Sequence, residues 1–273
     1  MYPPYWVSSK EGTFHLFASN PFYMKIDGPY ALFTDPLNKG LGEKVSYIVP
    51  TMQALKGIVE AVYWKPTLYY LIDEVKVLKP IQTETKGILL PMNNGSKDLS
   101  HFTYLRDVSY AIKFHFEWAE NRPELQQDQN EIKHEQILLR SMARGGRHDI
   151  FLGTRECIGT VSRLRKGEYE KLSSPIHGTV SLGIMFHSFS YQDYALNKKG
   201  EGTLYSQFDS IVMQDGTIRF KRPEECAIQH RLNEYKVKQF MKKDIKSVEK
   251  EWEEYNKVGD IDNESIPNAS QDV

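Results

Sequence analysis

The sequence is poor in cysteine, with only Cys157 and Cys226 among its 273 residues. Their separation fits none of the short spacings of a metal site, and two cysteines are too few for a disulfide framework. We therefore expect reduced thiols and a cytoplasmic location. The eight histidines are scattered along the chain without a ligand spacing, so we expect neither a metal nor another cofactor.

Long apolar runs are missing as well, and no stretch approaches the roughly 18 residues that a membrane span needs. Residues 1–20 lack the basic and apolar segments of a signal peptide. Lys and Arg number 35 against 36 Asp and Glu, so a uniformly basic coat for nucleic acid is excluded and any phosphate-binding surface must be local. The chain also lacks a Walker loop, a dinucleotide fingerprint and a serine nucleophile elbow, which leaves metal-free acid–base chemistry.

Hydrophobic residues make up 40% of the sequence, enough to build the core of one large or two small domains. Their spacing predicts the order strand, helix, strand, strand, helix, strand, which is the split βαβ order of a ferredoxin-like fold. The clearest strand is 108–118, where apolar and polar residues alternate. Strands are predicted at 22–26, 30–33, 68–78, 108–118 and 150–164, helices at 51–65 and 131–144, and loops at 88–99 and 121–130.

Three more strands, at 180–189, 204–213 and 217–220, predict a small antiparallel β domain with a hairpin turn at 214–216. From 232 to 255, apolar residues at helical spacing predict a charged helix, expected to pack on this chain or on a neighbouring subunit. Residues 259–273 are polar and predicted to be disordered. The expected organisation is a leader at 1–20, a ferredoxin-like domain at 21–165, a small antiparallel β domain at 166–226 and a charged helical tail at 227–273 with a disordered end.

Lys133 and His134 stand at the head of the second predicted helix. A cation and an imidazole beside the free N–H groups of a helix start suit a phosphate. Arg140 and Arg144 fall on the same helical stripe as Lys133, and Arg147 and His148 follow in a glycine-containing turn, which suits a phosphate backbone. The alternatives are a solvated helix face and a first-turn histidine that merely packs on a neighbour.

The first predicted helix carries Lys56 and Tyr63 seven residues apart on one stripe. In a ferredoxin-like fold both helices pack on the same face of the sheet, so Tyr63 can approach Lys133 and His134. The alternative for Tyr63 is an ordinary half-buried tyrosine that closes a helix.

Many blocks of the sequence, taken together, resemble a known protein family. From about Pro21 to Cys226 the chain resembles the fifth CRISPR-associated protein of the Dvulg subtype (type I-C), a member of the RAMP superfamily. The resemblance implies an α+β fold with a ferredoxin-like, RRM-like domain followed by a small β domain. The chain departs from the family in its leader, its long charged tail, and His148 where an arginine is common. The matching blocks, in chain order, are 28–37, 42–51, 53–67, 115–118, 122–125, 130–134, 145–157, 185–189 and 222–226.

The resemblance also implies an activity, the metal-independent cleavage of precursor CRISPR RNA at the base of each repeat hairpin. The ribose 2′-OH attacks the adjacent phosphorus and leaves a 2′,3′-cyclic phosphate. The mature guide RNA is then held by its 5′ handle, with other subunits of the type I-C interference complex as partners. The family's catalytic positions fall on Tyr63, Lys133 and His134. Candidate RNA contacts, each of which could instead be a surface ion pair, are Lys56, Lys65, Arg140, Arg144, Arg147, His148 and Arg155.

Two other functions fit the same sequence. Related proteins in other CRISPR subtypes only cap the guide RNA, so a non-catalytic structural subunit is one alternative. A general binder of double-stranded RNA is the other, and it predicts equal affinity for unrelated hairpins.

Overall fold

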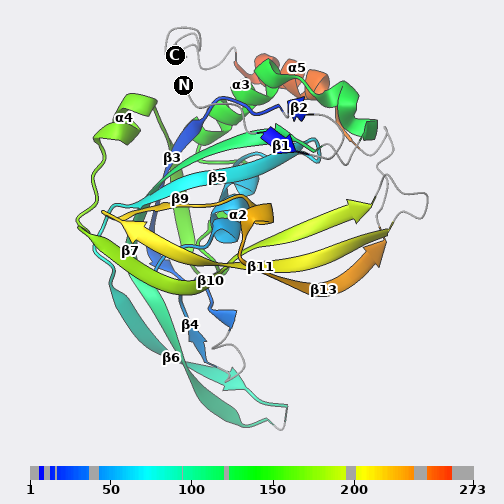
Figure 1. Cartoon of the computed structure of the whole chain (residues 1–273). Helices are drawn as coiled ribbons and strands as arrows, with labels where there is room; N and C mark the ends of the chain where they lie inside the picture. The colour runs from blue at the N-terminus through cyan, green and yellow to red at the C-terminus, as the bar shows by residue number, and fades with distance from the viewer. Residues whose placement is uncertain are drawn as a thin grey trace.

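A computed structural model describes residues 6–8, 13–15, 17–36, 43–93, 95–119, 123–194, 201–236 and 245–259. The fold is α+β, a mostly antiparallel sheet with a few helices (Figure 1). The strands are β1 (Trp6–Ser8), β2 (Thr13–His15), β3 (Phe22–Ala31), β4 (Lys44–Val45), β5 (Leu68–Val77), β6 (Thr83–Pro91), β7 (Lys97–Trp118), β8 (Ile150–Phe151), β9 (Ile158–Leu164), β10 (Thr179–Tyr194), β11 (Glu201–Gln214), β12 (Thr217–Arg219) and β13 (Ile228–Lys236). The helices are α2 (Met52–Val62), α3 (Glu131–Ala143), α4 (Lys166–Lys171) and α5 (Val248–Gly259), with 3-10 turns η1 (Pro123–Asp128) and η2 (Pro223–Glu225).

Four strands in the order β9-β3-β7-β5 form the part of the sheet that carries the site. Every neighbouring pair among them is antiparallel. Helix α2 lies between β3 and β5 in the chain, and α3 lies between β7 and β9. The predicted order of strands and helices is therefore confirmed for this half of the chain.

The strands of the second half join the same sheet rather than forming a separate one. The short strand β12 pairs with β5, with Thr217 opposite Lys76, and β12 also pairs with β11. Strand β11 continues to β10 on one side and to β13 on the other. The three strands predicted between 180 and 220 are thus present, and the boundary drawn at 165/166 stays a prediction.

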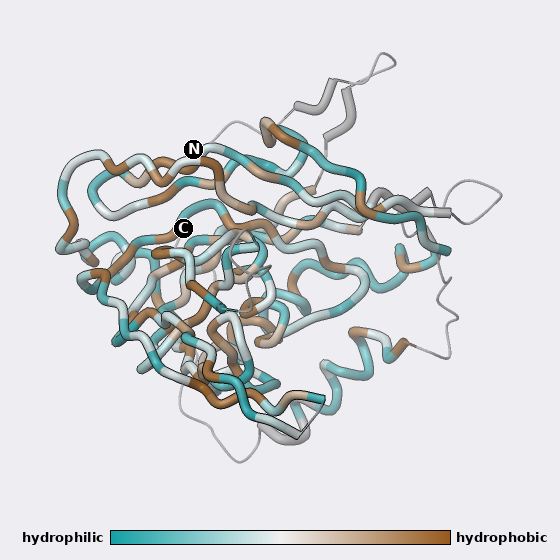
Figure 2. Tube along the Cα trace, turned by 90° about the horizontal axis from the view of Figure 1, so that it is seen from below, coloured by the Kyte–Doolittle hydropathy of each residue, from teal (hydrophilic) through white to brown (hydrophobic). Residues whose placement is uncertain are grey.

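Strand β7 supplies the centre of the core because its side chains alternate as predicted. Ile112, Phe114 and Phe116 are fully buried and face α2 and α3, while Lys113 and His115 point to the other side of the sheet. Figure 2 shows hydrophobic and hydrophilic residues following one another closely along the described chain. A single cluster of buried side chains joins the sheet to both helices.

Each of the two helices begins at a polar cap. The Thr51 hydroxyl accepts from the Ala54 N–H at 3.2 Å at the start of α2. The Asn130 side chain accepts from the Lys133 N–H at 3.1 Å at the start of α3. Helix α3 ends at Arg144, followed by Gly145 and Gly146 with positive φ, so the predicted helix and its glycine stop are confirmed.

The predicted loop at 88–99 is wrong, because these residues form a long hairpin. Strand β6 pairs with the first part of β7, from Thr83 opposite Leu105 to Pro91 opposite Lys97. The hairpin extends away from the body of the molecule (Figure 1) and is mostly exposed. Strand β6 has no buried side chain, so its sequence carries no clear strand signal, whereas Phe102 and Tyr104 of the paired part of β7 are buried in the core cluster.

The predicted strand at 150–164 is two strands, β8 and β9, separated by a turn. Gly153 in that turn has a φ of +94°, and a Cβ there would lie 2.1 Å from the Leu32 carbonyl oxygen. Only glycine allows this close approach.

The helix predicted from 232 is also partly wrong, because residues up to 236 form strand β13 and α5 begins only at Val248. Pairing with β11 decides the conformation of β13, whose side chains are mostly exposed. Disorder is predicted for residues 259–273; Gly259 is the last residue of α5, and 260–273 lie outside the described part of the chain. None of the helices among the described residues is long and apolar enough to cross a membrane.

Candidate active site

Tyr63 and His134 meet where the end of α2 lies beside the start of α3. The Tyr63 hydroxyl is 2.8 Å from His134 Nδ1, and both residues are 0% exposed. Tyr63 is not in the last turn of α2 as predicted but follows it as the C-cap residue, in an extended conformation. Because the backbone of Tyr63 is extended, its ring does not lie on the same helical stripe as Lys56, contrary to the prediction from the sequence.

The second nitrogen of His134 determines the direction of the hydrogen bonds. Nε2 lies 2.8 Å from the backbone carbonyl oxygen of Asp128, and because a carbonyl only accepts, Nε2 carries the proton. Nδ1 of the neutral ring is then the acceptor, and the Tyr63 hydroxyl donates to it. The result is a chain of donors running from Tyr63 through His134 to the Asp128 backbone.

Burial keeps both side chains neutral. It lowers the pKa of His134 to about 4, although the Asp128 carbonyl and carboxylate act in the opposite direction. Burial also raises the pKa of Tyr63 well above its usual value, and the carboxylate of Glu251 adds to that rise. The rings of Trp118 and Phe116, 5.7 and 6.4 Å from the imidazole between centroids, form part of this apolar environment.

Asp128, at the end of η1, connects the site to its surroundings. Its carboxylate accepts from the Thr67 hydroxyl at 3.0 Å and forms an ion pair with Lys65 at 3.2 Å. It also accepts from the backbone N–H of Val248, the first residue of α5, at 2.6 Å. The Asp128 carboxylate thus binds the first N–H of α5, beside the cap Ser247, whose hydroxyl accepts from the Lys250 N–H at 3.4 Å. The backbone carbonyl of Asp128 meanwhile orients His134.

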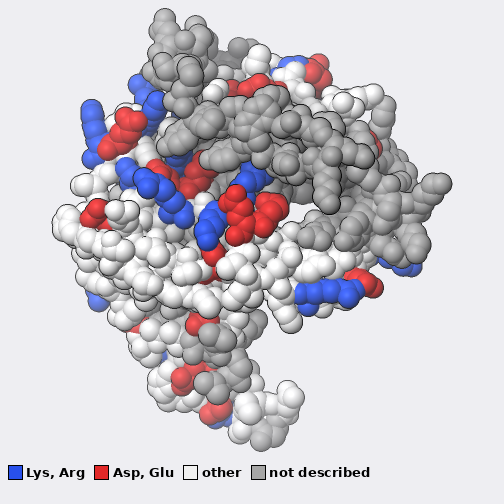
Figure 3. Space-filling view, viewed as in Figure 1, with Lys and Arg blue, Asp and Glu red and all other residues white. Residues whose placement is uncertain are grey.

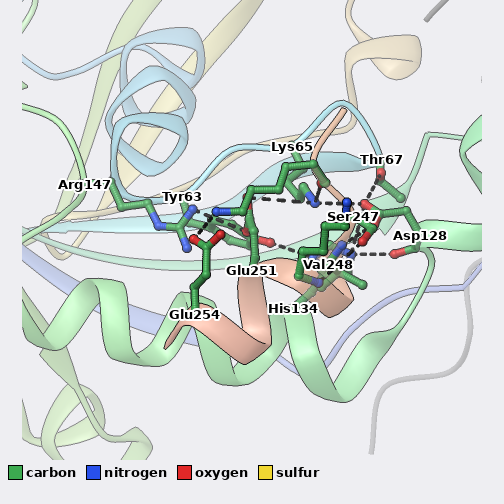
Figure 4. A network of polar contacts seen from close by, with 12 residues as sticks. Tyr63, Lys65, Thr67, Asp128, His134, Arg147, Ser247, Val248, Glu251 and Glu254 are labelled. Carbon is green, nitrogen blue, oxygen red and sulfur yellow. Dashed lines mark hydrogen bonds and ion pairs between the residues drawn. The ribbon is translucent and has the colours of Figure 1, made fainter. Parts of the chain in front are cut away.

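Three of the predicted cations lie against acidic side chains of α5, and Figure 4 shows two of them, Lys65 and Arg147, beside Glu251. Lys133 forms an ion pair with Glu249. Lys65, only 4% exposed, lies 3.9 Å from Glu251, and Arg147 lies 3.5 Å from the same carboxylate. The Arg147 guanidinium also sits 4.5 Å from the centre of the Tyr63 ring, as a cation over its face.

The other predicted RNA contacts are spread more widely. Lys56 lies over the ring of Tyr69 at 3.9 Å and near Glu60, and burial lowers its pKa. Arg140 is half-buried in the last turn of α3, and Arg144 caps the end of that helix. The exposed His148 anchors the following turn through its N–H, which donates to the Ala61 carbonyl at 3.1 Å. Arg155 is exposed in the turn between β8 and β9.

Sequence reasoning missed Asp128, Thr67, Glu249 and Glu251. Asp128 carries a weak signal, because it lies six residues before His134 in the loop that leads into the helix. The two glutamates carry none, since they lie more than a hundred residues away in a segment full of Lys and Glu.

Charge on the surface is local. On the face drawn in Figure 3, acidic and basic residues lie side by side in small groups, and the described residues show no continuous basic patch there. Within the described ranges, no group of three or more His, Cys, Asp or Glu is placed to hold a metal ion.

Residues 23–221 match the family described as CRISPR-associated protein (Cas_Cas5). Two curated relatives are named CRISPR pre-crRNA endoribonuclease Cas5d. The one from Mannheimia succiniciproducens is 31% identical over 150 residues, which cover 46% of this chain and 64% of the relative. The one from Thermus thermophilus is 43% identical over 56 residues, 20% of this chain and 24% of the relative. The matched segment therefore spans less than two thirds of the length of either relative.

A solved structure titled as the crystal structure of a CRISPR-associated protein is similar over a longer stretch. It is 44% identical with a TM-score of 0.65, and the match covers 79% of this chain and 99% of that one. Tyr63, Lys133 and His134 all lie within the segment that matches the family, whereas α5 lies beyond its end at residue 221.

Proposed function

The chain belongs to the Cas5 family of CRISPR-associated proteins, and we propose that it is an endoribonuclease that cuts precursor CRISPR RNA at the repeat hairpin. After cleavage it keeps the 5′ handle of the guide RNA as a subunit of the type I-C interference complex. The names of the two curated relatives support this proposal. So does the hydrogen bond between Tyr63 and His134, two residues 71 positions apart in the chain, and this is the observation that carries it.

We assign the half of the chain that holds the site to the ferredoxin-like, RAMP type of domain. The strand order β9-β3-β7-β5, all antiparallel, with α2 and α3 as the two connecting helices, supports the assignment. In this arrangement the end of the first helix and the start of the second lie together, which is where the candidate site is.

The reaction begins with the ribose 2′-OH next to the scissile phosphate. The 2′-oxygen attacks phosphorus while its proton passes to the Tyr63 oxygen, and the Tyr63 proton passes along the existing hydrogen bond to His134 Nδ1. The imidazolium that forms is stabilised by Asp128, whose carbonyl accepts from Nε2 and whose carboxylate lies 3.9 Å away. A tyrosine that relays a proton in this way need not ionise, so its raised pKa is no obstacle.

Lys133 has the second role, the neutralisation of charge on the phosphorane. Loss of one such donor costs on the order of 3 kcal/mol in other enzymes. The bond from phosphorus to the 5′-oxygen then breaks, and that oxygen takes a proton from water. The imidazolium returns its proton through Tyr63 to the hydroxide that is left, which restores neutral His134 and a water molecule. The products are a 2′,3′-cyclic phosphate and a 5′-OH, and no metal takes part in any of these steps.

The remaining cations are assigned to binding. Arg147 and Lys65, both near Tyr63 and His134, would hold the phosphates that flank the scissile one. Lys56, Arg140, Arg144, His148 and Arg155 would contact the RNA farther away, through phosphates and shape, because the major groove of A-form RNA is too narrow to read.

The second candidate function is a non-catalytic subunit that caps the guide RNA. One observation favours it: Tyr63 and His134 are 0% exposed, so neither reaches an RNA in this conformation of the chain.

The test is incubation of the purified protein with a repeat-hairpin RNA in EDTA. The proposal expects cleavage into a 2′,3′-cyclic phosphate end and a 5′-OH end, and no cleavage of a hairpin with a 2′-deoxy group at the scissile nucleotide. Tyr63→Phe and His134→Ala should each lower the rate about 10²–10⁴-fold. Tyr191→Phe, at an exposed tyrosine of β10, is the matched control and should cut at the normal rate.

Binding without cleavage by the unaltered protein supports the capping subunit instead. Cleavage of the 2′-deoxy hairpin would exclude attack by the 2′-OH.

A further inference from the structure

Helix α5 lies against α3 and covers the candidate active site (Figures 1 and 4). Its first residue, Val248, is 1% exposed and belongs to the main core cluster, and Trp252 packs against that cluster one turn later. Tyr63 and His134 are buried in the structure with α5 in place. The helix thus occupies the route by which a ribose would reach the tyrosine hydroxyl.

The acidic side chains of α5 are placed on the cations of the site. Glu249 is paired with Lys133, and Glu251 lies between Lys65 and Arg147 at 3.9 and 3.5 Å. These are the groups that the proposed function assigns to phosphates. A carboxylate and a phosphate oxygen make the same kind of charge-assisted hydrogen bond with Lys and Arg. The two glutamates therefore stand where an RNA backbone would be expected.

The start of α5 is fastened to the same residue that orients His134. The Asp128 carboxylate accepts from the Val248 N–H, and the Lys65 ammonium donates to the backbone carbonyl of Lys246 at 2.5 Å. Displacement of α5 would release Lys65 from Glu251 and Lys246, leaving it paired with Asp128, which could still hold the imidazolium of the proposed mechanism. Asp128 therefore contacts both the start of α5 and His134, so displacement of the helix changes the contacts of the residue that orients the imidazole.

The ion pairs that hold α5 are of two kinds. Glu249 is 57% exposed, and exposed ion pairs are individually weak and screened by salt. Glu251 and Lys65 are 14% and 4% exposed, so their contact is largely buried. The apolar anchor consists mainly of Val248 and the half-buried Trp252.

We propose, on the basis of the proposed function, that α5 is an autoinhibitory strap whose glutamates occupy the phosphate-binding cations until RNA displaces them. RNA binds only those molecules in which the strap is open. If they are a minority, the apparent affinity for RNA equals the affinity of the open form multiplied by the fraction of open molecules. The strap selects for a ligand that supplies several phosphates at once, as a repeat hairpin does and a short oligonucleotide does not. It also protects the Tyr63–His134 pair from water in the free protein.

The test uses the full chain with Glu249→Gln and Glu251→Gln together. The matched control is Glu253→Gln with Glu170→Gln, which removes the same charge at an exposed position of α5 and one of α4. Affinity is measured with the 2′-deoxy repeat hairpin, so that cleavage does not enter. We expect the first variant to bind about tenfold more tightly than the unaltered protein and the control to bind within about twofold of it.

Hydrogen exchange on the unaltered protein gives a second measurement that needs no variant. The amides of Val248–Gly259 should lose protection when the 2′-deoxy hairpin is added. Unchanged or weaker RNA binding by the Glu249/Glu251 variant, or amides that stay protected in the complex, would overturn the strap.

The two proposals fail in different ways. Cleavage by a protein whose α5 stays protected refutes the strap and leaves the endoribonuclease standing. Tighter binding by the variant without any cleavage supports the strap and refutes the catalytic function.

Discussion

At the scale of single residues, the chain uses the buried His134 and the partly buried His115 in opposite ways. His134 is neutral because its ring is buried among aromatic side chains, and this burial outweighs the opposite effect of the Asp128 carbonyl that accepts from Nε2. His115, on the opposite face of β7, lies 2.9 Å from Asp73 and 3.7 Å from Glu117. Burial acts against its charged form, but the two carboxylates outweigh it and raise the pKa of His115 to about 9. A neutral imidazole suits the acceptance of a proton, and a charged one suits an ion-pair network.

The lowered pKa of His134 predicts that the protein loses stability in acid. The unfolded chain protonates this histidine near pH 6.5 and the folded one only near pH 4, so the unfolded state binds more protons between these values. The free energy of unfolding should therefore fall by about 2 kcal/mol for this residue between pH 7 and pH 5. Urea unfolding at both pH values measures it.

His134→Gln should show a smaller fall than the unaltered protein over the same range. Burial likewise lowers the pKa of His187 to about 4, and this residue contributes the same fall in the free energy of unfolding to the unaltered protein and to the variant. An identical fall in the two proteins would mean that His134 is not neutral in the folded state.

At the scale of elements, the start of α3 does most of the positioning. Asn130 caps the helix, Lys133 and His134 stand in its first turn, and η1 just before it supplies Asp128. A single short segment thus brings an ammonium, an imidazole and the group that orients the imidazole to one place. Tyr63 reaches them because α2 ends at Val62 and the next residue turns out of the helix.

Loss of the α3 cap should therefore reduce stability. Asn130→Ala removes the acceptor for the Lys133 N–H, and we expect a loss of about 1 kcal/mol in the free energy of unfolding. Asn130→Asp keeps an acceptor at the cap and adds a favourable charge to the helix start, so it should be close to the unaltered protein. Urea unfolding compares the three, and equal losses for Ala and Asp would show that the cap contributes nothing.

At the scale of the whole molecule, long-range contacts make the two halves of the chain depend on each other. Strand β12, from the second half, pairs with β5 of the first half. Helix α5, near the C-terminal end of the described residues, packs on α3. Arg222, in the second half, binds both carboxylate oxygens of Glu117 on β7, at 2.8 and 2.9 Å. Burial alone would raise the pKa of Glu117, but Arg222 and His115 together lower it to about 2.

Removal of Arg222 should therefore lower the free energy of unfolding of the whole protein, because its pair with Glu117 joins the two halves of the chain. Arg222→Gln leaves the nearly buried Glu117 with His115 as its remaining cation, and we expect a loss of about 2 kcal/mol in the free energy of unfolding. Arg222→Lys keeps the charge but not the two parallel bonds and should lose less.

A double-mutant cycle with Glu117→Gln isolates the pair, and a coupling energy of at least about 1 kcal/mol is expected. If the two substitutions prove additive, the pair does not connect the halves.

Much of the fold could be predicted from local patterns. The alternation at 108–118, the helix at 131–144 with its glycine stop, and the strands of the second half follow from periods of 2 and 3.6 residues. Strand β6, strand β13 and helix α4 could not be predicted, because backbone pairing or short length determines them and few of their side chains are buried. Of the candidate site, Tyr63, Lys133 and His134 were predicted. Asp128 and the glutamates of α5 were not.

By itself the sequence determined which chemical groups this protein has and where its main helices and central strand lie, since spacing and capping act between residues a few positions apart. Only the tertiary structure decided what those groups contact. Tyr63 donates to His134, Lys56 lies over Tyr69 instead, and Lys133 and Arg147 are paired with glutamates that follow more than a hundred residues later. A charged side chain can pair with any opposite charge that the fold brings near it, and no local pattern specifies which one that will be.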